Sequence, residues 1–155
     1  MTNKPSKFLA EAEVVIVGVG GIVGSMVAYW LAELGQKNIV GLEKSTIIPS
    51  DIASTAHASD FVYNTTHDKL GCWATNFSRK FYEDHGFFLK KGGLEICRKD
   101  DDARWEELKR KVESGKAFGP NIRLISAAEA KEKFPLLNEE SIRGAMWDPA
   151  AGLVT

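Results

Sequence analysis

A glycine-rich segment near the start of the chain constrains its fold more than any other feature. The β-branched run Val14–Val17, which has no polar alternation, leads directly into Gly18, Gly20, Gly21 and Gly24. Such a run is typical of a strand buried on both faces of a parallel sheet. Glycines after it allow a tight turn and a close approach of the backbone to a ligand. The sequence therefore predicts a strand that ends in a tight loop suited to ligand binding.

The residues after this loop predict a helix and a second strand. Gly35 follows the apolar stripe of residues 25–34 and ends the helix, and residues 38–43 are again mainly apolar. Two strands joined by a helix form a βαβ unit with a right-handed crossover. The helical stripe consists of Met26, Val27, Trp30, Leu31 and Leu34.

The order of these elements predicts a dinucleotide site. A strand, the glycine loop, a helix and a second strand are followed by an acidic residue. A helix N-terminus offers unpaired N–H groups to a pyrophosphate, and Glu43 lies 43 − 24 = 19 residues after Gly24, near the roughly 20 expected for a carboxylate that binds an adenosine ribose. A carboxylate here favours FAD or NAD over NADP, because it would repel a 2′-phosphate. A purely structural glycine turn is the alternative. The predicted site residues are Gly18, Gly20, Gly21, Ile22, Val23, Gly24, Glu43 and Lys44.

The loop is one residue longer than the simple G-x-G-x-x-G pattern. Val23 stands where the third glycine is expected, and Gly24 follows it. The pattern therefore leaves open whether Gly18 or Gly20 makes the tight turn.

The rest of the chain shows weaker periodicity. Residues 45–66 are rich in Ser, Thr, Ala and Asp without a clear period, which is typical of a functional loop. The later strands have no further buried β run beside them in the sequence, so we expect them to be isolated and to need partners. The predictions are helices over residues 68–85 and 101–116, a short helix from the Ser126 capping box to Pro135, strands over 92–97 and 142–147, and core positions for Trp73, Phe77, Phe81, Phe87 and Phe88.

Charge and cysteine content exclude several classes of function. The 20 Lys and Arg nearly balance the 21 Asp and Glu, for a net charge of −1, so the chain has no general attraction for nucleic acid or an anionic membrane. Cys72 and Cys97 are too far apart for a CxxC pair and too few for a Cys-based zinc site, so no metal is expected.

The longest apolar run is broken by four glycines and the start lacks a signal or transit pattern, so we expect no membrane span and a cytoplasmic location.

Several motifs, in order along the chain, resemble the D-amino-acid-oxidase-type flavoproteins. Residues 20–25 (GGIVGS), 28–35 (AYWLAELG) and 42–44 (LEK) are similar to the start of that superfamily. Residues 54–58 (STAHA) are similar to the segment of dimethylglycine and sarcosine dehydrogenases and oxidases in which a histidine carries FAD. The likeness continues from Glu13 onward through residues 92–95, 109–111, 126–137 and 147–153.

The resemblance implies an FAD enzyme that oxidises a C–N bond of an N-methylated amino acid by hydride transfer to the flavin. It places Ser54 and Thr55 near the cofactor and makes His57 the residue that carries FAD covalently, a role that suits a nucleophilic imidazole. A surface-loop histidine is the alternative. Ala53 and Asp60 depart from the residues usual in this segment. Tetrahydrofolate would bind only if a further domain exists outside this chain.

The expected fold class is α/β, in two incomplete portions. Residues 1–90 form a Rossmann-like FAD-binding βαβ portion, and residues 91–155 begin an α+β substrate domain. A third parallel strand and most of the substrate sheet are lacking, so the expected partner is the remainder of the enzyme, as a second chain or a C-terminal part, acting on an N-methyl amino acid. No catalytic residue is assigned. A non-catalytic remnant or assembly subunit and an NAD-dependent dehydrogenase are the alternatives.

Overall fold

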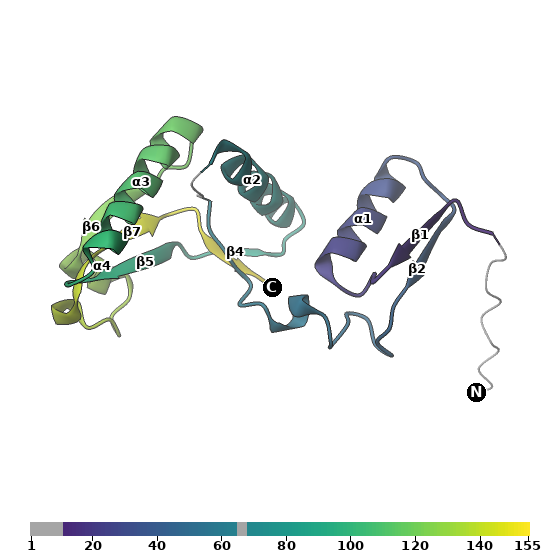
Figure 1. Ribbon diagram of the computed structural model, residues 1–155, viewed down its shortest axis with the longest axis horizontal. Helices are drawn as coiled ribbons and strands as arrows, with labels where there is room; N and C mark the ends of the chain where they lie inside the picture. The colour runs from purple at the N-terminus through teal and green to yellow at the C-terminus, as the bar shows by residue number, and fades with distance from the viewer. Residues whose placement is uncertain (1–10, 65–67) are drawn as a thin grey trace. The chain divides into compact units, whose positions relative to one another are not determined.

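The computed structural model describes residues 11–64 and 68–155, and the chain divides into two compact units, one up to Ser59 and the other Asp60–Thr155. In the described residues, the first unit holds a two-stranded parallel sheet, and the second holds two three-stranded antiparallel sheets. The predicted α/β class is thereby confirmed (Figure 1). The predicted functional boundary between residues 90 and 91 stays a prediction.

The first unit is the predicted βαβ unit. Its strands pair in parallel, with Val14 opposite Ile39. Gly35 ends the helix as predicted, because it adopts φ +92° and donates its N–H to the carbonyl of Ala32 at 2.9 Å. The helix begins earlier than its apolar stripe, since Gly21 is its N-cap. The elements are β1 (Val14–Val17), α1 (Ile22–Glu33) and β2 (Ile39–Leu42).

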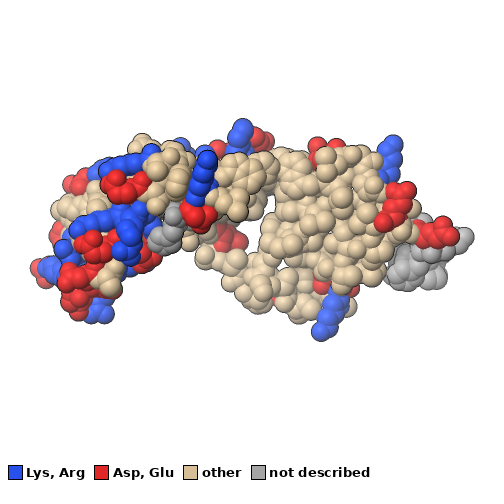
Figure 2. All heavy atoms as spheres, turned by 45° about the horizontal axis from the view of Figure 1, so that its top comes forward, with Lys and Arg blue, Asp and Glu red and all other residues tan. Residues whose placement is uncertain are grey.

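The prediction that β1 is buried on both faces is wrong for this unit. Of its four residues only Ile16 is buried, whereas Val17 is 82% exposed. The physical reason is that α1 is the only α-helix among the described residues of this unit, so part of the apolar sheet surface is left exposed. Figure 2 shows few charged side chains on the visible surface of this unit. Contiguous exposed apolar surface is uncommon on monomeric soluble proteins and is typical of an interaction surface.

The second unit is built around the sheet β5–β7–β6, with one helix on each face. Met146 and Ala145 are neighbours on the central strand and point to opposite faces. Met146 packs in a buried cluster with Leu108 of α3, and Ala145 packs in another with Ala130 of α4. The elements are α2 (Lys69–Asp84), β5 (Gly93–Arg98), α3 (Asp102–Phe118), β6 (Arg123–Ser126), α4 (Ala127–Lys133), η2 (Glu139–Ser141) and β7 (Ile142–Asp148).

The expectation that the two later strands would be isolated is wrong. β5 and β7 are each other's partners, in register from Gly93 opposite Asp148 to Cys97 opposite Gly144, after which the register shifts and Arg98 lies opposite Ile142. A second small sheet, of order β3–β8–β4, was not predicted at all, because two or three residues give no measurable alternation. Its strands are β3 (Phe61–Val62), β4 (Phe88–Lys90) and β8 (Gly152–Val154).

The helix predicted over residues 68–85 is confirmed. The core assignment is wrong for Trp73, Phe77 and Phe87, whereas Phe81 and Phe88 are half-buried. Asp68 caps α2 by accepting the N–H of Gly71 at 2.7 Å. Trp73 and Phe77 stack at 5.5 Å between ring centroids yet are 61% and 48% exposed, and Phe87 is also exposed. Both stacked side chains therefore keep about half or more of their surface exposed. No helix within the described ranges is both long and apolar enough to cross a bilayer.

Candidate dinucleotide-binding site

The tight turn of the glycine loop lies at Gly18. This residue has φ +88°, a left-handed conformation that strongly favours glycine, and its N–H extends the ladder by donating to the carbonyl of Leu42 at 2.7 Å. Gly20 is needed for a different reason: it leaves room for the Glu43 carboxylate, since a Cβ at this position would lie 2.7 Å from Glu43 Oε2. The structure thus resolves the question that the sequence pattern left open.

Gly24 takes the part of the third glycine although it comes one residue late. A Cβ on Gly24 would lie 2.2 Å from the carbonyl oxygen of Gly18, so the helix can pack on the loop only if this position lacks a side chain. Val23, which stands where the pattern expects glycine, is 76% exposed and meets no such restriction. Ile22 is also exposed. The extra loop residue therefore leaves the close helix–loop packing intact.

The N-terminus of α1 is suited to an anionic ligand. Its N-cap, Gly21, provides no side-chain cap, and its first turn carries no acidic residue. The positive end of the helix dipole therefore has no carboxylate of its own helix beside it. One N–H of its first turn, that of Ile22, donates to Thr55 Oγ1 at 3.0 Å.

Glu43 lies directly against the glycine loop. Its Oε2 accepts the N–H of Gly20 at 2.8 Å, and its Oε1 accepts those of Lys44 at 2.9 Å and Ser45 at 3.0 Å. These backbone donors, Ser45 first and then Gly20, hold the pKa of the Glu43 carboxyl below its ordinary value. The carboxylate is therefore ionised and fixed in orientation at neutral pH. Lys44 contributes its backbone, and its side chain is exposed.

The segment after Glu43 folds back onto the glycine loop, which the sequence did not indicate. The N–H of Ser50 donates to the carbonyl of Gly20 at 3.0 Å, and the Ser50 side chain is buried. Ala53 lies 3.5 Å from the position of a Cβ on Gly21. No spacing rule could have identified Ser50, because its role depends on a contact across 30 residues.

His57 is the last residue of a 3₁₀ turn, η1 (Ser54–His57), and its side chain is exposed. The bond between Thr55 and Ile22 ties this turn to the start of α1. The structure thus brings the glycine loop, Glu43 and Thr55 together, while Ser54 has an exposed side chain. The covalent role of His57 stays a prediction. Among residues 11–64 and 68–155, no three His, Cys, Asp or Glu side chains gather as a metal site would require.

Comparison with known proteins decides the family. Residues 13–155 match the model of DAO, FAD dependent oxidoreductase. The chain belongs to the DAO family. This membership confirms the flavoprotein resemblance and favours the FAD interpretation over the NAD-dependent alternative.

Two curated relatives and one solved structure show how much of a DAO-family protein the chain spans. Human sarcosine dehydrogenase is 30% identical over 96% of this chain and 16% of its own length. The pyruvate dehydrogenase phosphatase regulatory subunit of Mus musculus is 31% identical, over 94% of this chain and 17% of its own. The L-proline dehydrogenase of P. horikoshii superposes with a TM-score of 0.80 at 32% identity, covering 93% of this chain and 38% of that one. The chain therefore spans about a sixth of these curated relatives.

Proposed function

We propose that this chain supplies the adenine side of the FAD site in an oxidoreductase that demethylates an N-methylated amino acid of the sarcosine or dimethylglycine type. The observation that carries the proposal is the geometry of the glycine loop. Gly18 makes the tight turn, Gly24 allows α1 to pack closely on the loop, and the Glu43 carboxylate accepts the N–H of Gly20. The likeness to sarcosine dehydrogenase supports the substrate class.

The residues of the first unit fit an FAD molecule bound by its adenosine end. The uncapped start of α1 suits the pyrophosphate, and Glu43 suits the hydroxyls of the ribose, which donate to a carboxylate. FAD, when bound, supplies the acceptor for the hydride. The described side chains bind and orient the cofactor, and groups that contact the substrate would come from the remainder of the enzyme.

His57 is the proposed point of covalent attachment for the flavin. Its imidazole is exposed at the end of a short turn, and that turn is tied through Thr55 to the first residue of α1. A nucleophile on a segment anchored to the cofactor loop is in a suitable place for a bond to the cofactor. Covalent attachment would fix the flavin against loss from an enzyme whose site is shared between separate parts of the polypeptide.

Acid precipitation of the co-purified enzyme tests both the cofactor and the bond. The chain purified together with the remainder of the enzyme should be yellow, and its flavin absorbance should stay with the precipitated protein. In His57→Ala the flavin should pass into the supernatant, whereas His85→Ala, the matched histidine control at the C-cap of α2, should retain it. Acid-soluble flavin in the unmodified enzyme would overturn the covalent bond, and protein free of flavin would overturn the cofactor itself.

A second candidate function is a non-catalytic assembly subunit. It is favoured by one observation, that a 31% identical relative is named a regulatory subunit. This candidate predicts stable association with a partner chain, without oxidation of sarcosine or dimethylglycine and without bound flavin. Oxygen or dye reduction with these two amines distinguishes the candidates, because turnover is expected only from the oxidoreductase.

A further inference from the structure

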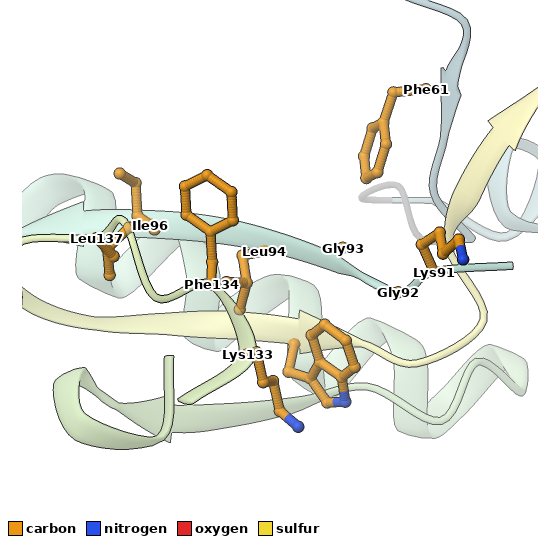
Figure 3. A pocket seen from close by; sticks show the side chains of 10 residues that line it. Phe61, Lys91, Gly92, Gly93, Leu94, Ile96, Lys133, Phe134 and Leu137 are labelled. Carbon is orange, nitrogen blue, oxygen red and sulfur yellow. The ribbon is translucent and has the colours of Figure 1, made fainter. Parts of the chain in front are cut away.

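Two features of the described residues have room or hydrogen-bonding capacity for a ligand: a groove in the second unit and a buried hydroxyl in the first. The groove has a volume of about 660 Å³ and is lined mainly by apolar side chains, among them Leu94, Phe134 and Leu137 (Figure 3). An apolar lining of this kind does not by itself specify an occupant. The buried hydroxyl is that of Ser50, and its surroundings do specify one.

The Ser50 hydroxyl is buried without a hydrogen-bond partner. Ser50 is 2% exposed, and no atom of the described residues meets the geometry of a hydrogen bond to its Oγ. Such a group costs free energy, because it has lost its bonds to water and gained none in the protein. Native proteins keep few of these groups, so each has a physical reason to be there.

Ser50 and Glu43 meet beside Gly20. A Cβ on Gly20 would lie 2.6 Å from Ser50 Cβ and 2.7 Å from Glu43 Oε2, so both side chains lie next to the same point. The Ser50 hydroxyl also helps to lower the pKa of the Glu43 carboxyl, after the larger effects of the N–H groups of Ser45 and Gly20. The unpartnered hydroxyl therefore belongs to the same part of the candidate site as Glu43.

The backbone that carries Ser50 is fixed, whereas its hydroxyl is free to turn. Ser45 Oγ lies 2.6 Å from Asp51 Oδ1 and accepts the N–H of Ile47 at 3.2 Å, and the N–H of Ser50 donates to the carbonyl of Gly20 at 3.0 Å. Rotation about χ1 has three staggered positions. The hydroxyl can therefore be redirected toward a ligand without any movement of the backbone.

Glu43 has capacity for only one hydroxyl of a ribose. A carboxylate offers about four lone-pair positions, and this one already accepts three N–H groups, those of Gly20, Lys44 and Ser45. The adenosine ribose carries two adjacent hydroxyl groups, at C2′ and C3′. One of them can donate to the remaining position on Glu43, and the other needs a different partner.

We infer that Ser50 is a second ribose-binding residue, whose hydroxyl bonds to the ribose hydroxyl that Glu43 does not accept. The inference rests on the proposed function, in which Glu43 binds the adenosine ribose of FAD. A serine suits this contact because its hydroxyl both donates and accepts. Ser50 then distinguishes an intact diol from a ribose that lacks one hydroxyl.

Titrations with FAD and with two FAD analogues test this inference. The analogues lack the 2′-hydroxyl or the 3′-hydroxyl of the adenosine, and the protein is the co-purified enzyme carrying His57→Ala and depleted of flavin. Ser50→Ala in this background should weaken the binding of FAD roughly three- to tenfold, the effect of one hydrogen bond. Ser78→Ala, the matched control at an exposed serine of α2, should leave the affinity unchanged.

The analogues identify the contact itself. One of them should bind equally well with and without the Ser50→Ala substitution, because it lacks the hydroxyl that Ser50 contacts. The other should still bind less tightly to the Ser50→Ala variant. An unchanged affinity for FAD, or a loss of the same size for FAD and both analogues, would overturn the inference.

Thermal unfolding of the same flavin-depleted enzyme separates a ligand contact from a structural role. Removal of a buried hydroxyl that has no partner should not lower the midpoint of unfolding, whereas removal of a structural hydrogen bond would. A lower midpoint in Ser50→Ala would therefore overturn the inference. An enzyme that binds no FAD would overturn the proposed function as well, whereas FAD binding that Ser50→Ala leaves unchanged overturns this inference alone.

Discussion

The glycines of the loop are required for different physical reasons, and substitution separates them. Gly24 cannot accept a Cβ without moving the backbone of Gly18, whereas the nearest atom to a Cβ on Gly21 is 3.5 Å away. Gly24→Ala should therefore lower the free energy of unfolding by roughly 2–3 kcal/mol. Gly21→Ala, the matched control, should change it by less than about 1 kcal/mol. Urea unfolding followed by circular dichroism measures both, and equal stability of the two variants would contradict the packing described for Gly24.

Glu43 makes the glycine loop sensitive to acid. Its pKa is lowered in the folded chain by the N–H groups of Ser45 and Gly20, so the ionised form stabilises the loop. This contribution is complete above the ordinary, unfolded pKa of about 4.3 and is lost as the pH falls through the lower folded pKa. The amide resonance of Gly20 should shift in that acidic range.

The matched variant for this titration is Glu43→Gln, which keeps the size of the side chain and removes its charge. The Gly20 amide should then show no shift between pH 6 and pH 3, roughly the range over which a carboxyl titrates. An unchanged titration in the variant would mean that another group causes the shift.

The spacing of residues predicted that the glycines and Glu43 lie close together, because most of these contacts are local. Gly18 and Gly20 belong to the loop, Gly24 lies in the first turn of α1, and the position of Glu43 follows from the length of a βαβ unit. Ser50 and the bond from Ile22 to Thr55 depend on how a non-periodic segment folds back, and no short-range pattern reports such a contact.

Among the elements of the second unit, the end of β7 is joined to the segment after β3 by a buried carboxylate. Asp148 is 3% exposed and accepts the backbone N–H of Asn64 at 2.7 Å and that of Ala150 at 2.9 Å. Asp148→Ala should cost about 2–3 kcal/mol of unfolding free energy, because it leaves buried N–H groups unpaired. Asp100→Ala, at an exposed ion pair with Arg98, should cost less than about 0.5 kcal/mol. Thermal unfolding measures the difference, and similar losses would contradict the structural role of Asp148.

Elements with local signals were predicted well, and elements fixed by distant partners were not. The Ser126 capping box is present, with the N–H of Glu129 donating to Ser126 Oγ at 3.1 Å. β3 consists of two residues whose partner, β8, lies about 90 positions along the chain, so nothing near it in the sequence marks it as a strand. Trp73 and Phe77 follow the helical period of buried residues, but period alone does not state which surface will cover them.

On the scale of the whole molecule, both units expose apolar surface and open sheet edges. Val17 and Leu34 in the first unit and Trp73 in the second are each more than half exposed, and the chain spans 16% of sarcosine dehydrogenase. These two observations support the proposal that further polypeptide covers the exposed faces. Composition alone did not reveal these exposed apolar faces. The fraction of apolar residues is that of an ordinary globular protein, and it does not show which of them are buried.

The decisive measurement is a titration with FAD of the co-purified His57→Ala enzyme, which lacks the proposed covalent bond and can therefore be depleted of flavin; binding is monitored by the quenching of flavin fluorescence. Saturation is expected at one FAD per chain. In the same His57→Ala background, Gly24→Val should reduce the affinity at least roughly a hundredfold, because the loop and helix can no longer pack closely. NADH should not compete. Saturable binding of NADH with no binding of FAD, or unchanged FAD affinity in Gly24→Val, would contradict the claim that this glycine loop holds the adenine side of an FAD site.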